Sequence, residues 1–343
     1  MPGSGLGTQL GLIPEVTVGT PLTVTRFYEI DKLSPTHQKI TAVSQGLRAT
    51  ARGHRERNRT ITGKGVQLST SLTVFSKGFG IFLSHALGSS TIAQIAATPT
   101  WRQIHLVGDL TGKGMTMQGG FQESYSTTVR PFTYNGCKIT DLELACQIDG
   151  LLKMNLSIDG WNWTNATGLA TTAYLGTMEE FNWSQVTATV GATASTSAGR
   201  TTVSGGTAIK GLRGISLKIG NKLRTDRRVA GGAGVKIEQA ENDFRMLTGD
   251  LDVEFADRTQ LVDLFDPDTS TTLVFTWTGV TDDGSGNKPV IRVIYPKVKF
   301  DSGNPDVGGP DIVDGKVSFT AYEQDDGLNP LCQFEYESQD TAI

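Results

Sequence analysis

An alternation of apolar and polar residues runs through the segment FRMLTGDLDVEF, residues 244–255. From position 247 onward every second residue is Leu, Gly, Leu, Val or Phe, and the residues between are Thr, Asp, Asp and Glu. A period of two predicts a strand with one buried face and one acidic face in water. Apolar residues at helical spacing then predict a short helix over 258–265, with Asp257 as its N-cap and Pro267 just beyond its end.

The same order of a strand and a short helix occurs earlier in the chain. The segment GVQLSTSLTVF alternates over residues 65–75, and apolar residues at helical spacing predict a helix over 79–87. Ser76 is the expected N-cap of this helix, and Gly88 is its expected terminator. The chain therefore contains two similar strand-and-helix units.

Strand-like segments follow both predicted helices. A hairpin is expected around Asp149-Gly150, because this pair accommodates the positive φ angles of a tight turn. Asp326-Gly327 stands before the last strand-like segment of the second unit, and YNGCKI at 134–139 resembles YPKVKF at 295–300. The expected strands lie at 102–107, 115–121, 142–148, 152–158, 272–279, 289–300, 315–324 and 331–336.

Turn regions rich in arginine precede both units, at 46–59 and 222–228. Together with the shared order of elements, they predict a tandem duplication of one mainly β domain. The two domains are assigned to 1–165 and 166–343, with the join between 160 and 180. Each domain is expected to carry one short flanking helix.

Composition supports strands and turns over long helices, because Gly is abundant at 41 of 343 residues. The net charge of −4 hides an uneven distribution. Residues 1–120 hold 12 Lys and Arg against 5 Asp and Glu, whereas residues 236–343 hold 8 against 22. A head-to-tail assembly could use this gradient for register and steering. Alternatively, both sets of charges only solvate the surface.

Groups that would carry catalysis are scarce. The four histidines show no metal-binding spacing, and the three cysteines lack a CxxC pair, which suits a reducing compartment. The segment GDLTGKGMT at 108–116 departs from a phosphate-binding loop in both spacing and final residue. The start of the chain lacks a signal-peptide pattern, and no stretch approaches 18 apolar residues. We therefore expect neither an enzyme nor a cofactor, and no membrane contact.

Two groups of polar residues are the candidate functional sites. The first is a basic group of arginines between residues 48 and 59. It could contact nucleic acid, but it lacks interleaved aromatic residues. We therefore favour an exposed loop that becomes ordered when it contacts an acidic neighbour. The acidic residues Asp250, Asp252 and Glu254, and the acidic residues at 263, 266 and 268, could suggest calcium, but the spacing of a calcium loop is absent. The basic group is Arg48, Arg52, Arg55, Arg57 and Arg59, and the polar stripe is Ser71, Thr73, Asp250, Asp252 and Glu254.

The order of these segments resembles that of the tail tube (major tail) proteins of long-tailed bacteriophages. The resemblance is carried by FNWSQVTATVG (181–191), IKGLRGISLKIGNKL (209–223), the unit at 244–265, TLVFTWTG (272–279) and the segments between 295 and 336. It implies β-sandwich or barrel domains in a virion protein that is assembled in the host cytoplasm. It also implies stacked rings that form a tube for DNA ejection, and contacts with the tape measure, tail tip and tail terminator proteins.

The resemblance also suggests roles for the two polar groups. The stripe is the candidate lumen-facing surface, past which DNA would move non-specifically, and the basic group is the candidate inter-ring contact loop. If rings of this family contain six domains, three chains with two domains each would form a homotrimer with pseudo-sixfold symmetry. A six-chain ring is the alternative.

Two other functions fit the pattern. A tube protein of a contractile injection or secretion system would share the fold. A carbohydrate-binding β-sandwich on a virion surface is the second alternative, for which Trp161, Trp163 and Trp183 are the candidate aromatic residues, although they are expected to pack the join between the copies.

Overall fold

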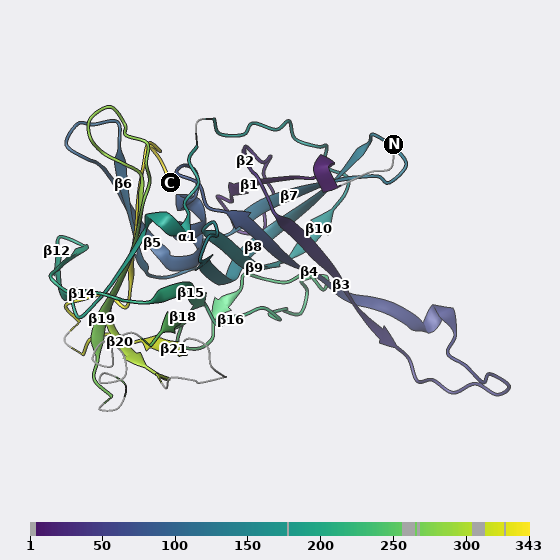
Figure 1. Ribbon diagram of the computed structural model, residues 1–343. Coiled ribbons are helices and arrows are strands. Elements are labelled where there is room, and N and C mark those ends of the chain that lie inside the picture. Colours follow the sequence, from purple (N-terminus) through teal and green to yellow (C-terminus); the bar gives the residue numbers. More distant parts are fainter. Residues whose placement is uncertain (1–4, 177, 256–264, 266–267, 304–312, 326) are drawn as a thin grey trace.

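The computed structural model describes residues 5–176, 178–255, 265, 268–303, 313–325 and 327–343. These residues form a body of antiparallel strands around one short helix, α1 (Gly80–Leu87), and a long arm that stands away from the body (Figure 1). Three 3-10 turns, two small hairpins and the strands make up the rest. The turns are η1 (Gly5–Gly7), η2 (Glu56–Asn58) and η3 (Trp183–Gln185), and the hairpins are β12 (Thr193–Ser197) with β13 (Arg200–Ser204) and β16 (Leu223–Arg224) with β17 (Ala240–Glu241).

A central sheet of eight strands crosses both halves of the chain. Every neighbouring pair is antiparallel, and the middle of the sheet is the pairing of β8 with β15. The strands are, in order, β3 (Lys32–Val43), β4 (Arg59–Thr73), β9 (Lys153–Gly160), β8 (Val129–Gln147), β15 (Leu212–Gly220), β18 (Met246–Glu254), β21 (Asp314–Ala321) and β20 (Val290–Phe300).

The long strands β8 and β20 each leave the central sheet and continue into a second sheet. In the first half, β8 pairs with β7 (Met115–Gln122) and β10 (Asn162–Thr164), and β7 pairs with β1 (Gln9–Pro14), which pairs with β2 (Arg26–Tyr28). In the second half, β20 pairs with β19 (Thr271–Thr278) and β22 (Gln333–Ser338). The strand β19 pairs with β11 (Val186–Val190), which pairs with β14 (Thr207–Ala208).

The order of pairing is the same in both halves. The series β3, β4, β9, β8, β7, β1 in the first half corresponds to β15, β18, β21, β20, β19, β11 in the second. One pair of strands in the first half has no counterpart in this series. β5 (Gly88–Gln94) and β6 (Trp101–Val107) follow α1, yet β6 pairs with β22 of the second half. The sheets of the two halves are therefore joined in two places.

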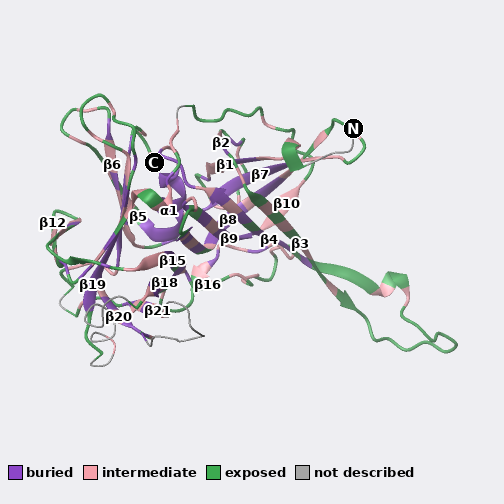
Figure 2. Ribbon diagram, in the orientation of Figure 1, coloured by how far each residue is buried: buried purple, intermediate pink, exposed green. Residues whose placement is uncertain are grey.

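The apolar core lies between the sheets and around α1 (Figure 2). All eight residues of α1 are buried, and Phe82 packs against Tyr28 with ring centroids 4.8 Å apart. His85 is satisfied inside the helix by the carbonyl of Ile81, 2.8 Å from its Nδ1. A helix enclosed on all sides has no solvent-exposed face, which explains why Ser84 and His85 are its only polar residues.

The predicted strand at 244–255 is confirmed over Met246–Glu254 as β18, whose residues 247, 249, 251 and 253 are buried, but Phe255, predicted on the same buried face, lies beyond the strand and is exposed. The predicted first helix is confirmed as α1, and Gly88 ends it with φ of 99°. The expected cap was wrong, because Ser76 accepts a hydrogen bond from the Glu179 amide and α1 has no side-chain cap. The hairpin turn is confirmed, with Asp149 at φ of 59°. The helix predicted at 258–265 lies outside the described residues, except for Phe265.

Candidate functional site

The outward face of the central sheet carries the predicted polar stripe. Ser71 and Thr73 lie on β4, and Asp250, Asp252 and Glu254 lie on β18. All five are partly exposed, while the residues that alternate with them are buried. Because β4 and β18 belong to one sheet and their buried residues face one core, the structure brings the stripe together on a single surface.

A line of hydrogen bonds crosses this face in the first half. Ser71 Oγ donates to Asn155 Oδ1 at 2.7 Å, and Asn155 Nδ2 donates to Glu143 Oε2 at 3.1 Å. Glu143 Oε1 accepts a hydrogen bond from Ser216 Oγ at 2.6 Å. Since Ser216 lies on β15, the line passes from β4 through β9 and β8 into the second half of the chain.

The line continues around Asp250 in the second half. Asp250 accepts hydrogen bonds from Ser318 Oγ at 2.7 Å and from Lys218 Nζ at 3.0 Å. Lys218 also lies 3.9 Å from Glu143 Oε1. Burial alone would raise the pKa of Asp250, but the hydrogen bonds from Ser318 and Lys218 outweigh it and hold the pKa below its usual value. The bond to Asp250 in turn raises the pKa of Lys218.

The face carries both signs of charge, which differs from the acidic face that the β18 sequence predicts. Asp31 pairs with Lys153 at 3.2 Å, and Glu254 pairs with Arg213 at 3.4 Å. Neighbouring strands supply these cations, so a single strand's composition does not report the charge of the assembled face. Lys218 pairs with Asp250 and Arg213 pairs with Glu254, so two of the three acidic residues of β18 face a cation.

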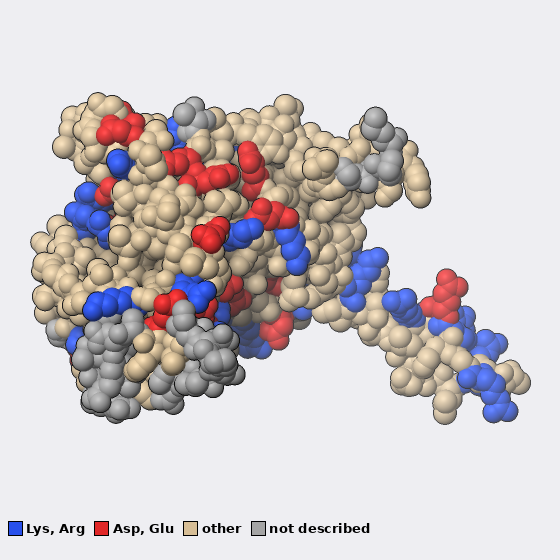
Figure 3. All heavy atoms as spheres, viewed as in Figure 1, with Lys and Arg blue, Asp and Glu red and all other residues tan. Residues whose placement is uncertain are grey.

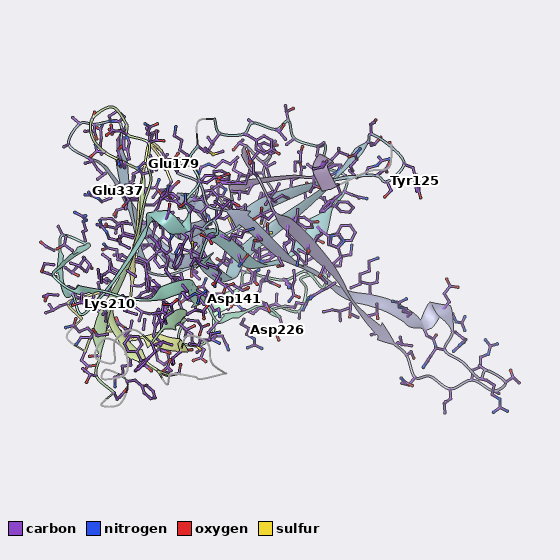
Figure 4. All side chains as sticks on the ribbon, in the orientation of Figure 1. Tyr125, Asp141, Glu179, Lys210, Asp226 and Glu337 are labelled. Carbon is purple, nitrogen blue, oxygen red and sulfur yellow. The ribbon has the colours of Figure 1, made fainter. Side chains whose placement is uncertain are left out.

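A shallow hollow of about 350 Å³ opens on this face beside the seam between β8 and β15. Its lining includes Asp141, Glu143 and Lys218, and Figure 4 labels Asp141 near the middle of the sheet. Paired charges and hydroxyls of this kind form a hydrated surface.

Five residues that complete this face were missed by sequence reasoning. Each lies on a strand whose alternation was visible, so the same period of two could have found them. What the pattern does not give is which strands become neighbours. The residues are Glu143, Asn155, Ser216, Lys218 and Ser318.

The basic group lies on the arm formed by the ends of β3 and β4 and the loop between them (Figure 3). Arg48, Arg52, Arg57 and Arg59 are exposed, and Arg55 is partly exposed. None of the five forms an ion pair with another described residue. The structure therefore places the basic group far from the polar stripe, on a separate surface.

Two of the three tryptophans considered for sugar binding contact other residues of the chain. Trp161 Nε1 donates to Gln239 Oε1 at 3.1 Å, which joins the two halves of the chain, and Trp163 stacks on His37 with ring centroids 4.1 Å apart. Trp183 begins η3. The expectation that they pack the join holds for Trp161, whereas Trp163 packs within the first half.

Metal ligands and thiols were the other candidate chemical groups. No group of three or more His, Cys, Asp or Glu among those residues could hold a metal ion. All three cysteines are buried, and burial raises the pKa of the Cys137 thiol well above its ordinary value. No helix within the described ranges is long and apolar enough to cross a membrane.

Two halves joined through a common sheet, with a hydrated outer face of paired charges, are features of a structural β protein. The chain matches the phage tail tube protein family over residues 5–321 and belongs to that family. No match was found among curated proteins. The chain is thus a structural component of the phage tail, within a family of structural proteins rather than enzymes. A member of this family assembles into a tube and works with other tail proteins.

Proposed function

We propose that residues 1–165 and 166–343 are two copies of one tail-tube domain and that three chains close a ring of six such domains. The identical order of strand pairing in the two halves supports this proposal. Linking two domains in one chain raises the effective concentration of one beside the other and lowers the entropic cost of closing the ring.

The seam between β8 and β15 is the observation that carries the proposal. It pairs seven consecutive positions, from Gly214 with Gln147 to Gly220 with Asp141, and so makes one sheet from two domains. In the first half, β3 occupies the place that β15 occupies in the second. Among the described strands, β3 pairs with β4 alone, so its outer edge can accept a strand from another copy.

By register, Lys299 near the end of β20 corresponds to Lys138 of β8, which lies three residues before the seam, so we place the partner edge at the end of β20. A ring forms when β3 of each chain joins β20 of the next, as β15 joins β8 within the chain. Pro35 in β3 removes one backbone donor, which an edge strand tolerates and which blunts the edge in the free subunit.

In this ring the polar face of the central sheet lines the channel. Its carboxylates repel phosphate, and the paired lysines lack the free charge that would bind DNA tightly. DNA can then pass during ejection without a specific contact. Stacked rings form the tube around the tape measure protein, and the tail tip and tail terminator proteins close its ends.

Electron microscopy of the concentrated protein tests this function. Ring averages combined with the mass per unit length of the tube give the number of chains in each layer, and we expect three. Six chains per layer would instead make one domain an outer decoration, and the polar stripe would then not lie entirely in the channel. Absence of tubes at any concentration would overturn the proposal of self-assembly.

A further inference from the structure

The connection between β15 and β18, residues 221–245, folds back onto the first half of its own chain. Lys236 Nζ and Asp159 Oδ1 lie 2.5 Å apart, with both side chains at most 3% exposed. Gln239 Nε2 donates to the same carboxylate at 2.9 Å. Burial raises the pKa of Asp159, and the hydrogen bonds from Lys236 and Gln239 oppose that shift. A buried pair of this kind defines a specific docking site.

A second ion pair lies beside the first. Lys138 Nζ is 2.6 Å from Glu238 Oε1 and also donates to the carbonyls of Leu110 and Gln239. Lys138 is 2% exposed, and Trp161 closes the site through its bond to Gln239. The receptor on the first half therefore consists of residues of β8 and β9 and the residue after β9.

The strand register locates the matching surface on the second half. Lys138 pairs with Asp159 between β8 and β9, and Lys299 pairs with Thr320 at the same place between β20 and β21. Two residues after Asp159 and Thr320, Trp161 of the first half corresponds to Tyr322 of the second half. The counterparts of the docking residues are thus Lys299, Thr320 and Tyr322.

This matching surface is an open groove of about 640 Å³. Tyr322 is 47% exposed there, whereas its counterpart Trp161 is only partly exposed and Lys138 and Asp159 are buried under the connection. Thr320 Oγ1 donates to Asp301 Oδ2 at 2.6 Å on the same surface. The groove is lined by Asp268, Ser270, Lys297, Lys299, Tyr322, Glu323, Gln324 and Asp325.

The arm links β3 to β4, just as the connection at 221–245 links β15 to β18. The arm is therefore the counterpart of the connection. The register of β4 and β18 aligns Lys64 with Arg245, so the arm spans residues 39–64 and is one residue longer than the connection. The arm holds seven Lys and Arg and one Glu. In the groove, Asp268 is paired with Lys299, and Glu323 and Asp325 are the carboxylates left to face the arm, beside Lys297. Their charges are complementary.

The arm of the same chain starts at the opposite end of the central sheet from this groove. β3 and β20 lie at opposite ends of the central sheet, separated by seven strand spacings of about 4.8 Å, or roughly 30 Å. The arm also points away from the second half (Figure 1). The occupant of the groove is therefore a second copy of the chain.

We propose that the basic arm of one subunit docks in the groove formed by Asp268, Lys299, Tyr322, Glu323 and Asp325 of the adjacent subunit in the same ring. The inference rests on the ring proposed above and adds a site to it. The sequence predicts that the basic group contacts the next ring, whereas this proposal places its contact within the same ring. Each ring then has six equivalent dockings, three within chains and three between them.

Cross-linking tests this site. The variant carries Arg57→Cys and Glu323→Cys, and its tubes are treated with a short bifunctional maleimide, which tolerates more separation than a disulfide. The native cysteines are buried and stay unlabelled in the folded chain. The matched control pairs Arg57→Cys with Glu123→Cys, an exposed residue of the turn between β7 and β8. We expect efficient linkage in the first variant and at least tenfold less in the control.

The size of the products separates the outcomes. If the arm docks within its own ring, cross-linking can join no more chains than one ring contains. The products on a denaturing gel then end at the trimer. An unlimited ladder would place the arm on the next ring and overturn the proposal. Tubes that form normally with no linkage, or with equal linkage in the control, would also overturn it while leaving the tube function intact. Absence of wild-type tubes would instead contradict the proposed function.

A charge exchange provides a second, independent measurement. Glu323→Lys with Asp325→Lys should raise the concentration needed for tube formation roughly tenfold, as expected for two partly exposed ion pairs. Adding Arg55→Glu and Arg57→Glu should restore most of that loss. A combined variant that assembles worse than either parent variant would contradict direct contact between these groups.

Discussion

The two halves of the chain share an order of strands but differ in how they use the loop between the first two strands of the central sheet. The connection at 221–245 carries six Lys and Arg and four Asp and Glu, and it lies against its own chain. The arm at 39–64 carries almost only positive charge and stands in solvent (Figure 3). A loop that docks within its chain can bring and bury its own ion pairs. A loop that docks on another copy finds its counter-charges there.

The largest effect is expected from Lys236→Met, which breaks the docked connection. It leaves Asp159 buried without its cation, a loss of about 3–5 kcal/mol in the free energy of unfolding. Protonation of Asp159 limits the loss. Urea unfolding of the free subunit measures it. Arg55→Met in the arm is the matched control and should stay within about 0.5 kcal/mol of wild type. Equal losses in both variants would show that the arm is also docked in the free chain.

Acidification should weaken the first half, which holds all four histidines. Burial lowers the pKa of His85 to about 4 and of His105 to about 3. Both stay neutral in the folded chain at pH 5, whereas the unfolded chain binds protons below about pH 6.5. Stability is therefore present above pH 6.5 and falls as the pH drops, by about 2 kcal/mol per histidine between pH 7.5 and 5.

The variant His85→Asn isolates one of these contributions. An asparagine amide can donate to the Ile81 carbonyl as His85 Nδ1 does, but it does not titrate. Urea unfolding at pH 7.5 and at pH 5 should give a smaller difference for the variant than for wild type. The same pH dependence in both proteins would show that His85 does not remain neutral in the folded chain.

Reversing the arm should act on assembly and leave the subunit's own stability unchanged. We expect Arg55→Glu, Arg57→Glu and Arg59→Glu together to slow tube growth roughly tenfold at low salt and to reduce its salt dependence, because exposed charges are screened within about 10 Å at 0.1 M salt. Light scattering across a salt series measures both effects. Unchanged tube growth at every salt concentration would show that the arm takes no part in assembly.

The smallest effect is expected on the polar face, where Lys218→Met removes the cation between Asp250 and Glu143. Lys218 is nearly half exposed, so the loss at pH 7 should be below about 1 kcal/mol. The lowered pKa of Asp250 contributes stability above about pH 3.9 that is lost as the pH falls through its folded value. The difference from wild type should therefore shrink below pH 4, and a constant difference would exclude Asp250 as the partner.

Local patterns were enough to predict α1 and ten of the described strands, among them β8 and β18, but not β3 or β15. Alternation over 247–253 requires one face to be buried whichever strands are its neighbours, and Asp149-Gly150 closes a hairpin through local backbone geometry alone. The cap assigned to Ser76 was wrong for the opposite reason. Its hydroxyl is taken by Glu179, which is 103 positions away, so no local rule could find it.

The sequence by itself determined the β class, the apolar face of each strand, the basic arm and, through the order of segments, the resemblance to tail tube proteins. These depend on neighbours a few residues apart. The tertiary structure decided that β8 and β15 form a seam, that Lys218 and Arg213 pair with Asp250 and Glu254 of β18, and that Lys236 is buried against Asp159. Each of these depends on strand register between distant segments, since the partner of a charge is set by the packing of the whole sheet.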